Sequence, residues 1–440
     1  MSTEMKYQER LKRVSDAVAL TEPDTIPFIP IVQCFPYLQA GYTMADILYD
    51  TELTKARDSL FKYLDEYEPD VMMGHSYVNM GQGPINELGQ PKTTRWAGMP
   101  GNVIDENSIH QFIEFPILED ADFDRFVTDR SGWVMNQGMP RTSGVLEPFG
   151  QFDVSAMGVF GSHSRVAAAV STPEFKNMMQ TLWKINDMST ALQGKVRALN
   201  RDIEAYGYPI LATGHAGVPF DAYSDFLRGT LDGCADLYER PETVMAYCQE
   251  QLEITLEGVK LQGKMMPGKH VFMALHKGMD GFMSDEHYRK FYWDHLQTII
   301  NAIVDAGMVP YVYTEGKYNS RLECLKEVPR GKVIYHFEEV DMVKAKKVLG
   351  ETACIAGGFP VYLLDYGTKE QVVDEAKRLI DACAPGGGFI FETSCGIDLA
   401  KKENMEALRD TVRTYGKRRS AQRQQAGGDD SPACFFRGMY

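Results

Sequence analysis

The sequence has no hydrophobic run long enough to cross a membrane. A membrane-spanning helix needs about 20 predominantly apolar residues, and no apolar run in the 440 residues approaches that length. The first residues, MSTEMKYQERLKRVSD, are charged and lack the apolar centre of a signal peptide. We therefore expect a soluble protein that stays in the cytoplasm and does not act at a membrane.

The sequence also has too little positive charge for a nucleic-acid-binding protein. Lys and Arg number 46 against 61 Asp and Glu, which gives a formal net charge of −15. Because binding to a phosphate backbone requires clustered basic residues, this balance excludes nucleic acid as the expected partner and argues mildly against polyanionic substrates. The eight cysteines are scattered without a CxxC pair, so we interpret them as reduced thiols.

Short apolar runs rich in β-formers recur along the chain between turn residues. The eight runs are 26–32, 70–74, 209–213, 271–275, 309–313, 333–335, 353–357 and 388–391. Helical periods separate most of them, as in 370–383, where apolar residues recur at i, i+3 and i+4 before a Pro-Gly-Gly-Gly stop. Eight alternating units predict an α/β fold with a closed parallel sheet, the (β/α)8 TIM barrel.

One connection is far longer than an ordinary crossover between strands. About 135 residues separate the second run from the third, so we expect an insertion after the second strand, at about 76–206, that covers the barrel mouth as a lid or subdomain. The expected organisation is an N-terminal helix in 1–25, the barrel with its insertion in 26–416 and a flexible polar tail in 417–440.

Polar residues follow the apolar runs at the end of the barrel where such folds carry their active site. In chain order these residues are His75, His215, His276, Glu315, His336, the pair Gly357 and Gly358, and Cys395. Histidine, glutamate and cysteine are the residues that bind zinc and similar metals. Their convergence on one face predicts a metal site there.

Each of these residues also has a purely structural explanation. A strand-end histidine such as His215 can simply cap a loop, and a lone cysteine such as Cys395 can be a small buried hydrophobe. Glu315 is harder to explain, because an unpaired carboxylate beside a core is costly. Either a bound metal or a salt bridge to Lys317 or Arg321 would satisfy it.

A loop after the fourth run combines a base, a cation and an acid. His276, Lys277 and Asp280 lie within five residues of one another. With His215, these three are the candidate catalytic residues, suited to proton transfer or to holding a substrate carboxylate or hydroxyl. A solvated turn is the alternative interpretation.

Four separated segments carry a family resemblance. They are 217–229 (GVPFDAYSDFLRG), 236–244 (DLYERPETV), 365–372 (DYGTKEQV) and 387–397 (GGFIFETSCGI) with Glu403 and Asn404 after it. In this order they resemble the uroporphyrinogen decarboxylase superfamily, which also contains corrinoid-dependent methyltransferases. The resemblance runs from about 26 to 416 outside the insertion and implies a TIM barrel that often forms a homodimer.

The decarboxylase branch of this superfamily is recognised by an early arginine-rich segment that holds the carboxylates of the porphyrinogen. The nearest segment here, 34–42 (CFPYLQAGY), has Leu38 and Tyr42 where the arginines would fall. Without those bidentate groups, an octacarboxylate would find little to neutralise it. This departure argues against true uroporphyrinogen decarboxylation.

The methyltransferase branch commonly binds zinc through His-x-Cys-Gly after the fifth strand and a cysteine after the eighth. Glu315 falls on the first cysteine of that pattern and Tyr313 on its histidine, and only Cys395 is unchanged. Ether-demethylating members instead show a Glu-x20-His spacing, which Glu315 and His336 share. The resemblance therefore implies zinc held by Glu315, His336 and Cys395, with His276 as the fourth candidate ligand.

The implied activity is transfer of a methyl group from a methoxylated or methylamine-type small molecule to a corrinoid. The basic leaving group of such a donor needs a Lewis acid or a proton. The Asp-x-His-x-x-Gly cobalamin signature does not occur in the sequence, so the cobalamin or other corrinoid would come on a partner protein or free.

Two alternatives remain open at this point. One is a decarboxylase or other lyase that acts on a smaller carboxylated substrate, with Lys277, His215 or Arg228 supplying positive charge. The other is a barrel that binds a tetrapyrrole or corrinoid without turnover, against which the crowded polar strand ends argue.

Overall fold

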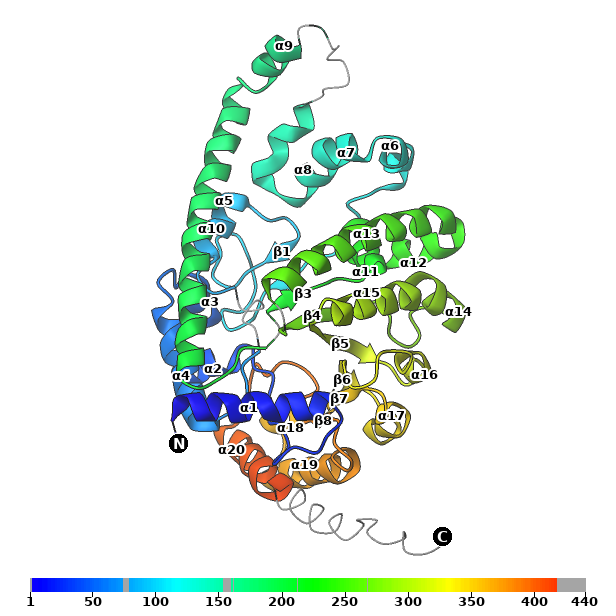
Figure 1. The fold of residues 1–440 in the computed structure, drawn as a ribbon. Helices are drawn as coiled ribbons and strands as arrows, with labels where there is room; N and C mark the ends of the chain where they lie inside the picture. The colour runs from blue at the N-terminus through cyan, green and yellow to red at the C-terminus, as the bar shows by residue number, and fades with distance from the viewer. Residues whose placement is uncertain are drawn as a thin grey trace, which may run out of the picture.

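The computed structural model describes most of the chain as alternating helices and parallel strands (Figure 1). The described residues are 2–73, 79–152, 160, 162–211, 213–266 and 268–417. No helix within these ranges is long and apolar enough to cross a membrane. Two predictions, the histidine at position 75 and the tail beyond Lys417, lie outside the described residues.

A parallel sheet of six strands forms the centre of the fold. The strands are β3 (Gly214–His215), β4 (His270–Leu275), β5 (Val309–Lys317), β6 (Ile334–Glu339), β7 (Cys354–Gly357) and β8 (Phe389–Ile390). Each strand pairs with the next one along the chain. The pairing of β5 with β6 sets Tyr313 beside His336 and shifts register between Thr314 and Lys317.

Two further segments connect β8 back to β3. Phe28 forms a parallel bridge with Phe391, just after β8, and the Asp70 N–H donates to the Phe28 carbonyl oxygen at 2.8 Å. Met72 forms a parallel bridge with Ile210, just before β3. The eight predicted runs therefore follow one another around the sheet in chain order, which confirms the predicted TIM-barrel fold with its insertion after the second run.

The N-terminal helix α1 (Thr3–Val18) packs against the amino-terminal ends of the strands. Its Val14, Ala17 and Val18 join a buried cluster with residues from the starts of the strands. The strand and segment members of this cluster are Ile29, Val71, Leu211, Tyr311, Ile334, Cys354, Ala356 and Ile390. The amino-terminal end of the barrel, called its lower end from here on, is therefore closed by apolar side chains. The carboxyl end, called the mouth, is where a functional site is expected.

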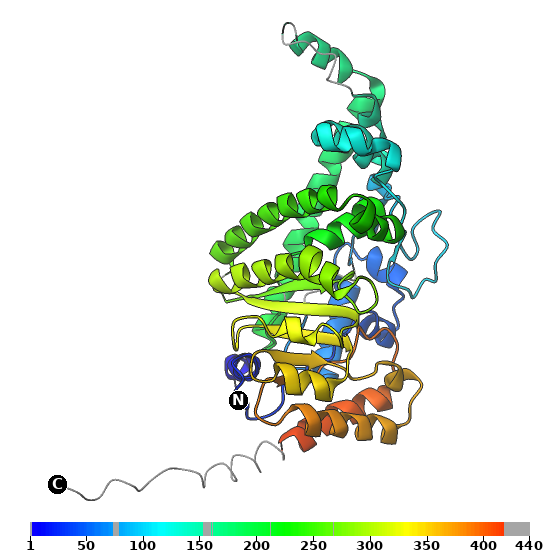
Figure 2. The same cartoon turned by 90° about the vertical axis from the view of Figure 1, so that its right-hand side faces the viewer.

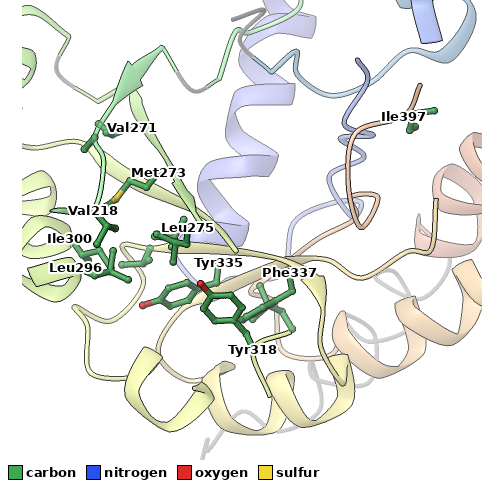
Figure 3. Close-up of a cluster of buried hydrophobic side chains, with 14 of the residues drawn as sticks. Val218, Val271, Met273, Leu275, Leu296, Ile300, Tyr318, Tyr335, Phe337 and Ile397 are labelled. Atoms are coloured by element: carbon green, nitrogen blue, oxygen red, sulfur yellow. The ribbon is translucent and has the colours of Figure 1, made fainter. Parts of the chain in front are cut away.

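Helices cover the outside of the barrel. The main ones are α4 (Thr54–Tyr67), α13 (Pro241–Met265), α15 (Asp294–Asp305), α17 (Met342–Leu349), α19 (Lys369–Cys383) and α20 (Lys402–Thr411). Figure 3 shows Met273 and Leu275 of β4 close to Leu296 and Ile300 of α15 in this outer core. Alternate residues of each strand thus face the helices, and the others face the barrel interior.

Further elements connect these helices to the strands. They are α2 (Phe35–Ala40), α3 (Met44–Leu48), α11 (Pro219–Tyr223), α12 (Thr230–Glu239), α14 (Asp285–His287), α16 (Leu322–Leu325) and α18 (Tyr362–Asp365), with the π-helical turns η4 (Ser224–Arg228), η5 (Tyr288–Trp293) and η6 (Val412–Gly416). Local signals place the boundaries: Thr368 and Gln371 form a capping box that starts α19, the helix predicted for 370–383.

The insertion forms a separate lobe that rises away from the barrel along the helix α10 (Pro173–Ala205) (Figures 1 and 2). Its other elements are α5 (Gly83–Gly89), β1 (Thr94–Arg95), β2 (Gln111–Phe112), η1 (Asp120–Asp122), α6 (Phe123–Thr128), α7 (Arg130–Trp133), η2 (Val134–Gly138), α8 (Met139–Thr142), η3 (Gly144–Gln151) and α9 (Ser162–Ala169).

The insertion is attached to the helices that follow β3. The backbone N–H groups of Ile117 and Leu118 both donate to the Leu227 carbonyl oxygen, at 2.9 and 2.8 Å. Phe126 of α6 also packs against Tyr247 of α13, with ring centroids 6.3 Å apart. The role of a lid over the barrel mouth stays a prediction.

Candidate functional site

Alternate residues of β5 point into the barrel and lead up to Glu315. Tyr311, Tyr313 and Glu315 are two residues apart, so they share one face of the strand. Tyr311 belongs to the closed lower cluster, and Tyr313 stacks on His336 with ring centroids 4.2 Å apart and planes at 5°. Glu315 completes the column at the carboxyl end, where its side chain is 47% exposed.

The partner of Glu315 is His276. The Glu315 Oε1 atom lies 3.8 Å from His276 Nε2, while Lys317 pairs with Glu339 at 3.2 Å and Arg321 pairs with Asp285. The two cations that sequence reasoning offered to Glu315 are thus engaged elsewhere. Burial raises the pKa of Glu315, the charge of His276 opposes that shift, and neighbouring carboxylates add to it.

His276 follows β4 directly and is held by two aspartates. Its Nδ1 atom lies 2.5 Å from Asp225 Oδ2, and its backbone N–H donates to Asp221 Oδ2 at 3.1 Å. Burial alone lowers the pKa of His276, but the hydrogen bond to Asp225 and the charges of Asp221 and Glu315 outweigh it and raise the pKa to about 9. At neutral pH the ring is therefore protonated, with Nε2–H on the side of Glu315.

Lys277 binds the other oxygen of the same aspartate. Its Nζ atom lies 2.8 Å from Asp225 Oδ1 and donates to Thr230 Oγ1 at 2.8 Å. Asp225 therefore bridges the two cations, one on each oxygen. It lies on the π-helical turn η4, and such turns often occur at functional sites because they displace a side chain from helical register.

Asp221 fixes the loop that carries both cations. It is 4% exposed and accepts hydrogen bonds from the backbone N–H of His276 (3.1 Å), from that of Lys277 (2.8 Å) and from the Tyr292 hydroxyl (2.7 Å). Burial raises its pKa to about 6 despite these donors. The backbone around His276 is thus tied to a buried carboxylate and cannot move toward solvent without breaking two hydrogen bonds.

The two other candidate catalytic residues have different surroundings. Asp280 accepts from the Ser320 hydroxyl at 2.8 Å and from the Ser320 N–H at 3.2 Å, so it holds the loop after β5. His215 pairs with Phe272 on β4, and Gln262 binds its backbone N–H and carbonyl. Burial and the charge of His276 lower the pKa of His215, which places its ring within electrostatic range of the protonated histidine.

His336 lies below the mouth, with both ring nitrogens occupied. Its side chain is fully buried, Nδ1 is 2.7 Å from Glu392 Oε2, and Nε2 is 3.1 Å from the Ser394 carbonyl oxygen. The Tyr311 hydroxyl donates to the same Glu392 oxygen at 2.7 Å. In this arrangement His336 has no ring nitrogen directed at a ligand.

The four predicted metal ligands are not assembled into one site. In the described ranges, no group of three or more His, Cys, Asp or Glu side chains is arranged to hold a metal ion. Glu315 and His276 face each other, His336 is bound to Glu392, and Cys395 lines a separate pocket of about 900 Å³. As placed, these residues do not fit a zinc site, and zinc stays a prediction.

The pocket that contains Cys395 adjoins the mouth through Glu338. The Gly316 N–H donates to Glu338 Oε2 at 2.5 Å, and Glu338 and Cys395 both line the pocket with Tyr362 and Asp398. Burial raises the pKa of the Cys395 thiol, the hydroxyl of its neighbour opposes the shift, and the charges of Glu338 and Asp398 add to it. Cys395 is therefore a neutral thiol in an acidic pocket at neutral pH.

Sequence reasoning missed four carboxylates of this region. Asp221 and Asp225 are four residues apart within the segment 217–229, a spacing that sets two side chains on one helical face. Glu338 is two residues beyond His336 in β6, so both face the same side of the strand. Glu392 belongs to the segment 387–397 and follows β8. Spacing was thus the signal for three of the four.

The positions of the absent arginines are apolar in the structure. Leu38 and Tyr42 are partly buried and pack against the core. Arg228, which the lyase alternative invoked, is buried and donates to Asp236 at 2.7 Å and to the Leu118 carbonyl oxygen at 2.6 Å. Its guanidinium thus stabilises the junction between η4 and the insertion.

Comparison with known proteins identifies relatives of the barrel. Residues 157–415, more than half of the chain, match the family model of uroporphyrinogen decarboxylase (URO-D). The uroporphyrinogen decarboxylase of Azoarcus sp. (strain BH72) is 24% identical over 299 residues, covering 62% of this chain and 81% of that protein. The uroporphyrinogen decarboxylase of Aromatoleum aromaticum is also 24% identical over 299 residues, with 62% and 82% covered.

A solved structure matches nearly the whole chain. A methyltransferase from Methanosarcina mazei superposes with a TM-score of 0.55 at 13% identity, covering 92% of this chain and 98% of that one. At this identity the match establishes the shared fold.

Proposed function

Because this chain belongs to the uroporphyrinogen decarboxylase (URO-D) family, we propose that it is a methyltransferase of that superfamily. It would transfer a methyl group from a methoxylated or methylamine-type small molecule to a corrinoid supplied by a partner protein or free. The observation that carries the proposal is the geometry of His276 at the barrel mouth, where Nδ1 lies 2.5 Å from Asp225 and Nε2 lies 3.8 Å from Glu315.

A methyl ether is a poor methyl donor because its leaving oxygen is basic. When the carbon–oxygen bond breaks, the electron pair stays on oxygen, and His276 Nε2–H is placed to donate its proton there. Asp225 stabilises the imidazolium before the transfer, and the backbone hydrogen bonds to Asp221 fix its position. A reduced corrinoid, when bound, would supply the nucleophile that accepts the methyl group.

The charges at the mouth favour a neutral or cationic donor. Asp225, Glu315 and Glu338 supply carboxylates against the two cations His276 and Lys277. A substrate with several carboxylates would be repelled by this excess. The apolar side chains at the arginine positions of the decarboxylases act in the same direction, so uroporphyrinogen is not the proposed substrate.

The pocket beside the mouth suits the body of a small donor. Its volume of about 900 Å³ lies within the range of small-molecule sites. Tyr362 and Tyr366 give it aromatic faces, and Glu338 connects it to Glu315 through Gly316. A methoxylated ring that stacks on these tyrosines would lie in the same pocket as Glu338 and Cys395.

The second candidate is a decarboxylase or lyase that acts on a small carboxylated compound. The observation in its favour is that the curated relatives, at 24% identity, are uroporphyrinogen decarboxylases. In that reaction Lys277 would hold the carboxylate, and His276 would protonate the carbanion left after loss of carbon dioxide. Both reactions thus use the same acid, and the product distinguishes them.

The test is a substrate panel with the purified protein. A methoxybenzene, tetramethylammonium, uroporphyrinogen and a small aromatic carboxylic acid are each incubated with cob(I)alamin, and both methylcobalamin and carbon dioxide are measured. Methylcobalamin formed from an uncharged or cationic donor supports the proposal. Carbon dioxide release without methyl transfer favours the lyase instead.

Two variants and a metal analysis accompany the panel. Glu315→Gln should slow the reaction, while Glu323→Gln, a matched change of an exposed carboxylate that pairs with Lys326, should not. The zinc prediction is tested by elemental mass spectrometry of the same preparation. Stoichiometric zinc that is lost in Cys395→Ser would support the predicted metal and would require the four ligands to rearrange on binding.

A further inference from the structure

One side of α13 carries an exposed apolar stripe. Ile254, Leu261 and Met265 are 56%, 59% and 72% exposed. With Gly258 they recur at i, i+4, i+7 and i+11, so all four residues lie on the same side of the helix. We call these four residues the α13 stripe.

The α13 stripe faces away from the barrel. On the opposite side of the helix, Leu252 and Val259 are buried, and a Cβ on Gly263 would lie 2.7 Å from the Cβ of Ala306, at the end of α15. Figure 1 shows α13 on the outside of the barrel, next to α15. The α13 stripe is therefore not part of the barrel core.

The insertion covers the same side of α13 just before the stripe begins. Phe126 packs against Tyr247, and Arg130 forms an ion pair with Glu250. Both α13 residues precede Ile254, from which the apolar side chains are exposed. Contiguous exposed apolar residues of this kind mark protein–protein interaction sites.

Four charged residues lie along one flank of the α13 stripe. Glu253 and Glu257 come first, Lys260 and Lys264 follow, and all four are exposed. The members of each like-charged pair are four residues apart, a spacing at which like charges destabilise a helix. A partner that brings positive charge to the first pair and negative charge to the second would relieve both.

A second copy of the same helix, in the antiparallel direction, supplies both charges. A two-fold axis just beyond Gly258 sets Glu253 beside Lys264 of the second copy. The same axis sets Glu257 beside Lys260 of the second copy, because both pairs have the same midpoint in the sequence. The symmetry also keeps the charged flanks of the two helices on one side of the interface.

Gly258 lies at the crossing point of this helix pair. Glycine inside a helix is less stable than alanine, and in the described part of the chain no atom lies within 4 Å of the place that a Cβ would take there. At a crossing of two helices the missing side chain has a use, because it lets the backbones approach closely. Ile254 and Leu261 of each copy would then pack around the crossing point.

We propose that the α13 stripe is the interface of a homodimer in which α13 packs antiparallel against α13 of a second copy. Since β4 starts soon after α13 ends, the stripe in the second half of α13 lies toward the lower end of the barrel. Both mouths would thus stay open in the dimer. The proposal does not depend on methyl transfer, so its failure would leave the proposed function untouched.

The first test is sedimentation velocity of the full chain over a range of concentrations, which should show a reversible dimer of the 49.5 kDa chain. Ile254→Ser and Leu261→Ser should each raise its Kd by roughly tenfold or more, because a symmetric interface loses the apolar area twice. The matched control is Val343→Ser on α17, which changes a similarly exposed residue (53%) and should leave Kd unchanged.

Two outcomes of this experiment would overturn the proposal. A chain that stays monomeric at every concentration would leave the α13 stripe to a different partner. A dimer whose Kd is the same in Ile254→Ser, Leu261→Ser and Val343→Ser would form through another surface.

The second test reverses charges to check the register. Glu253→Lys and Lys264→Glu should each raise Kd by roughly tenfold, because each brings like charges together at two places in the symmetric pair. Each substitution also converts a like-charged pair within α13 into an opposite-charged one, so the melting temperature of the monomer should not fall. The double variant Glu253→Lys/Lys264→Glu restores opposite charges across the interface and should regain the original Kd. A double variant that binds no more tightly than the single variants would contradict the antiparallel register.

Discussion

Two histidines in the barrel each face a carboxylate, but at different depths. His276 lies at the mouth, 2.5 Å from Asp225 and with 31% of its side chain exposed. His336 lies below, 2.7 Å from Glu392 and with 0% exposed. The second nitrogen of His336 is bound to the Ser394 carbonyl oxygen, whereas that of His276 is 3.8 Å from Glu315, too far for a strong hydrogen bond.

This difference separates a reactive group from a structural one. An imidazolium with one nitrogen in a loose contact can give its proton to a ligand that displaces Glu315 from that contact. A histidine with both nitrogens engaged and no access to solvent instead fixes the segments around it, here β6 and the loop after β8. Removing each histidine should therefore affect different properties of the protein.

The largest expected effect is on activity, from a change at the mouth. His276→Gln removes the proton donor, so the methyl-transfer rate with an ether donor should fall by roughly a hundred- to ten-thousand-fold. Thermal unfolding should change at neutral pH, where the protonated ring stabilises the fold, and should change little near pH 9, where that stabilisation is lost. Steady-state kinetics and a melting curve on the same sample check both expectations. A variant that keeps its rate would show that His276 is not the acid.

The next largest effect is on stability, from a change below the mouth. Glu392→Gln replaces the buried carboxylate that binds both His336 and the Tyr311 hydroxyl and should destabilise the fold by about 1 to 3 kcal/mol, because the amide is a weaker acceptor and brings an N–H₂ group without a partner. Urea unfolding measures this difference, and Glu339→Gln, on the exposed rim, is the control. Unchanged stability would mean that His336 has other partners when Glu392 is neutral, and the contrast between the two histidines would be lost.

A smaller effect is expected in the pH dependence of stability. The pKa of His276 is raised from 6.5 to about 9 in the folded protein, so the folded state binds its proton more tightly than the unfolded state. The stabilisation by this group is complete below pH 6.5 and is lost as pH rises through 9. The difference in urea midpoint between the unmodified protein and His276→Gln should therefore shrink between pH 6.5 and 9. A difference that grows over this range would contradict the raised pKa.

The smallest effect is expected from Glu315→Gln. Its charge is one of the contributions that raise the pKa of His276, and at 3.8 Å with half of the carboxylate exposed the contribution is modest. The midpoint of His276 should fall by roughly 0.5 to 1 in pH, measured by NMR titration of the full chain labelled with ¹⁵N-histidine. An upward movement would mean that Glu315 is protonated in the free enzyme and donates to His276.

The sequence predicted the order of the strands well and their lengths poorly. The apolar run 333–335 ends before His336, but β6 continues to Glu339, so His336 is an interior residue and Glu338 lies at the mouth. The run 309–313 likewise continues to Lys317 as β5. Apolar patterning cannot locate a strand end when the barrel interior itself is polar, because inward-facing histidine and glutamate interrupt the pattern while the backbone pairing continues.

The same limit explains which site residues were predicted. His276, Lys277 and Glu315 lie together at the mouth as expected, because a charged pair after a strand marks its end. The predicted metal ligands came from two levels of the barrel: Glu315 and His276 lie at the mouth, and His336 is fully buried. A spacing such as Glu-x20-His does not determine how two strands are aligned, nor which way the second ring nitrogen of the histidine points. The spacing of Asp221 and Asp225 indicates a shared helical face, but it does not show that the π-helical turn η4 directs Asp225 to both His276 and Lys277.

The most direct test of the central claim is the rate of methyl transfer to cob(I)alamin between pH 6 and 10, with the best donor from the panel. If His276 donates the proton to the leaving group, the rate is constant at low pH and declines with a midpoint near 9, the pKa of the imidazolium. His276→Gln should remove that decline together with most of the rate. A rate that rises through pH 9, or a decline at the same midpoint in His276→Gln, would contradict the account.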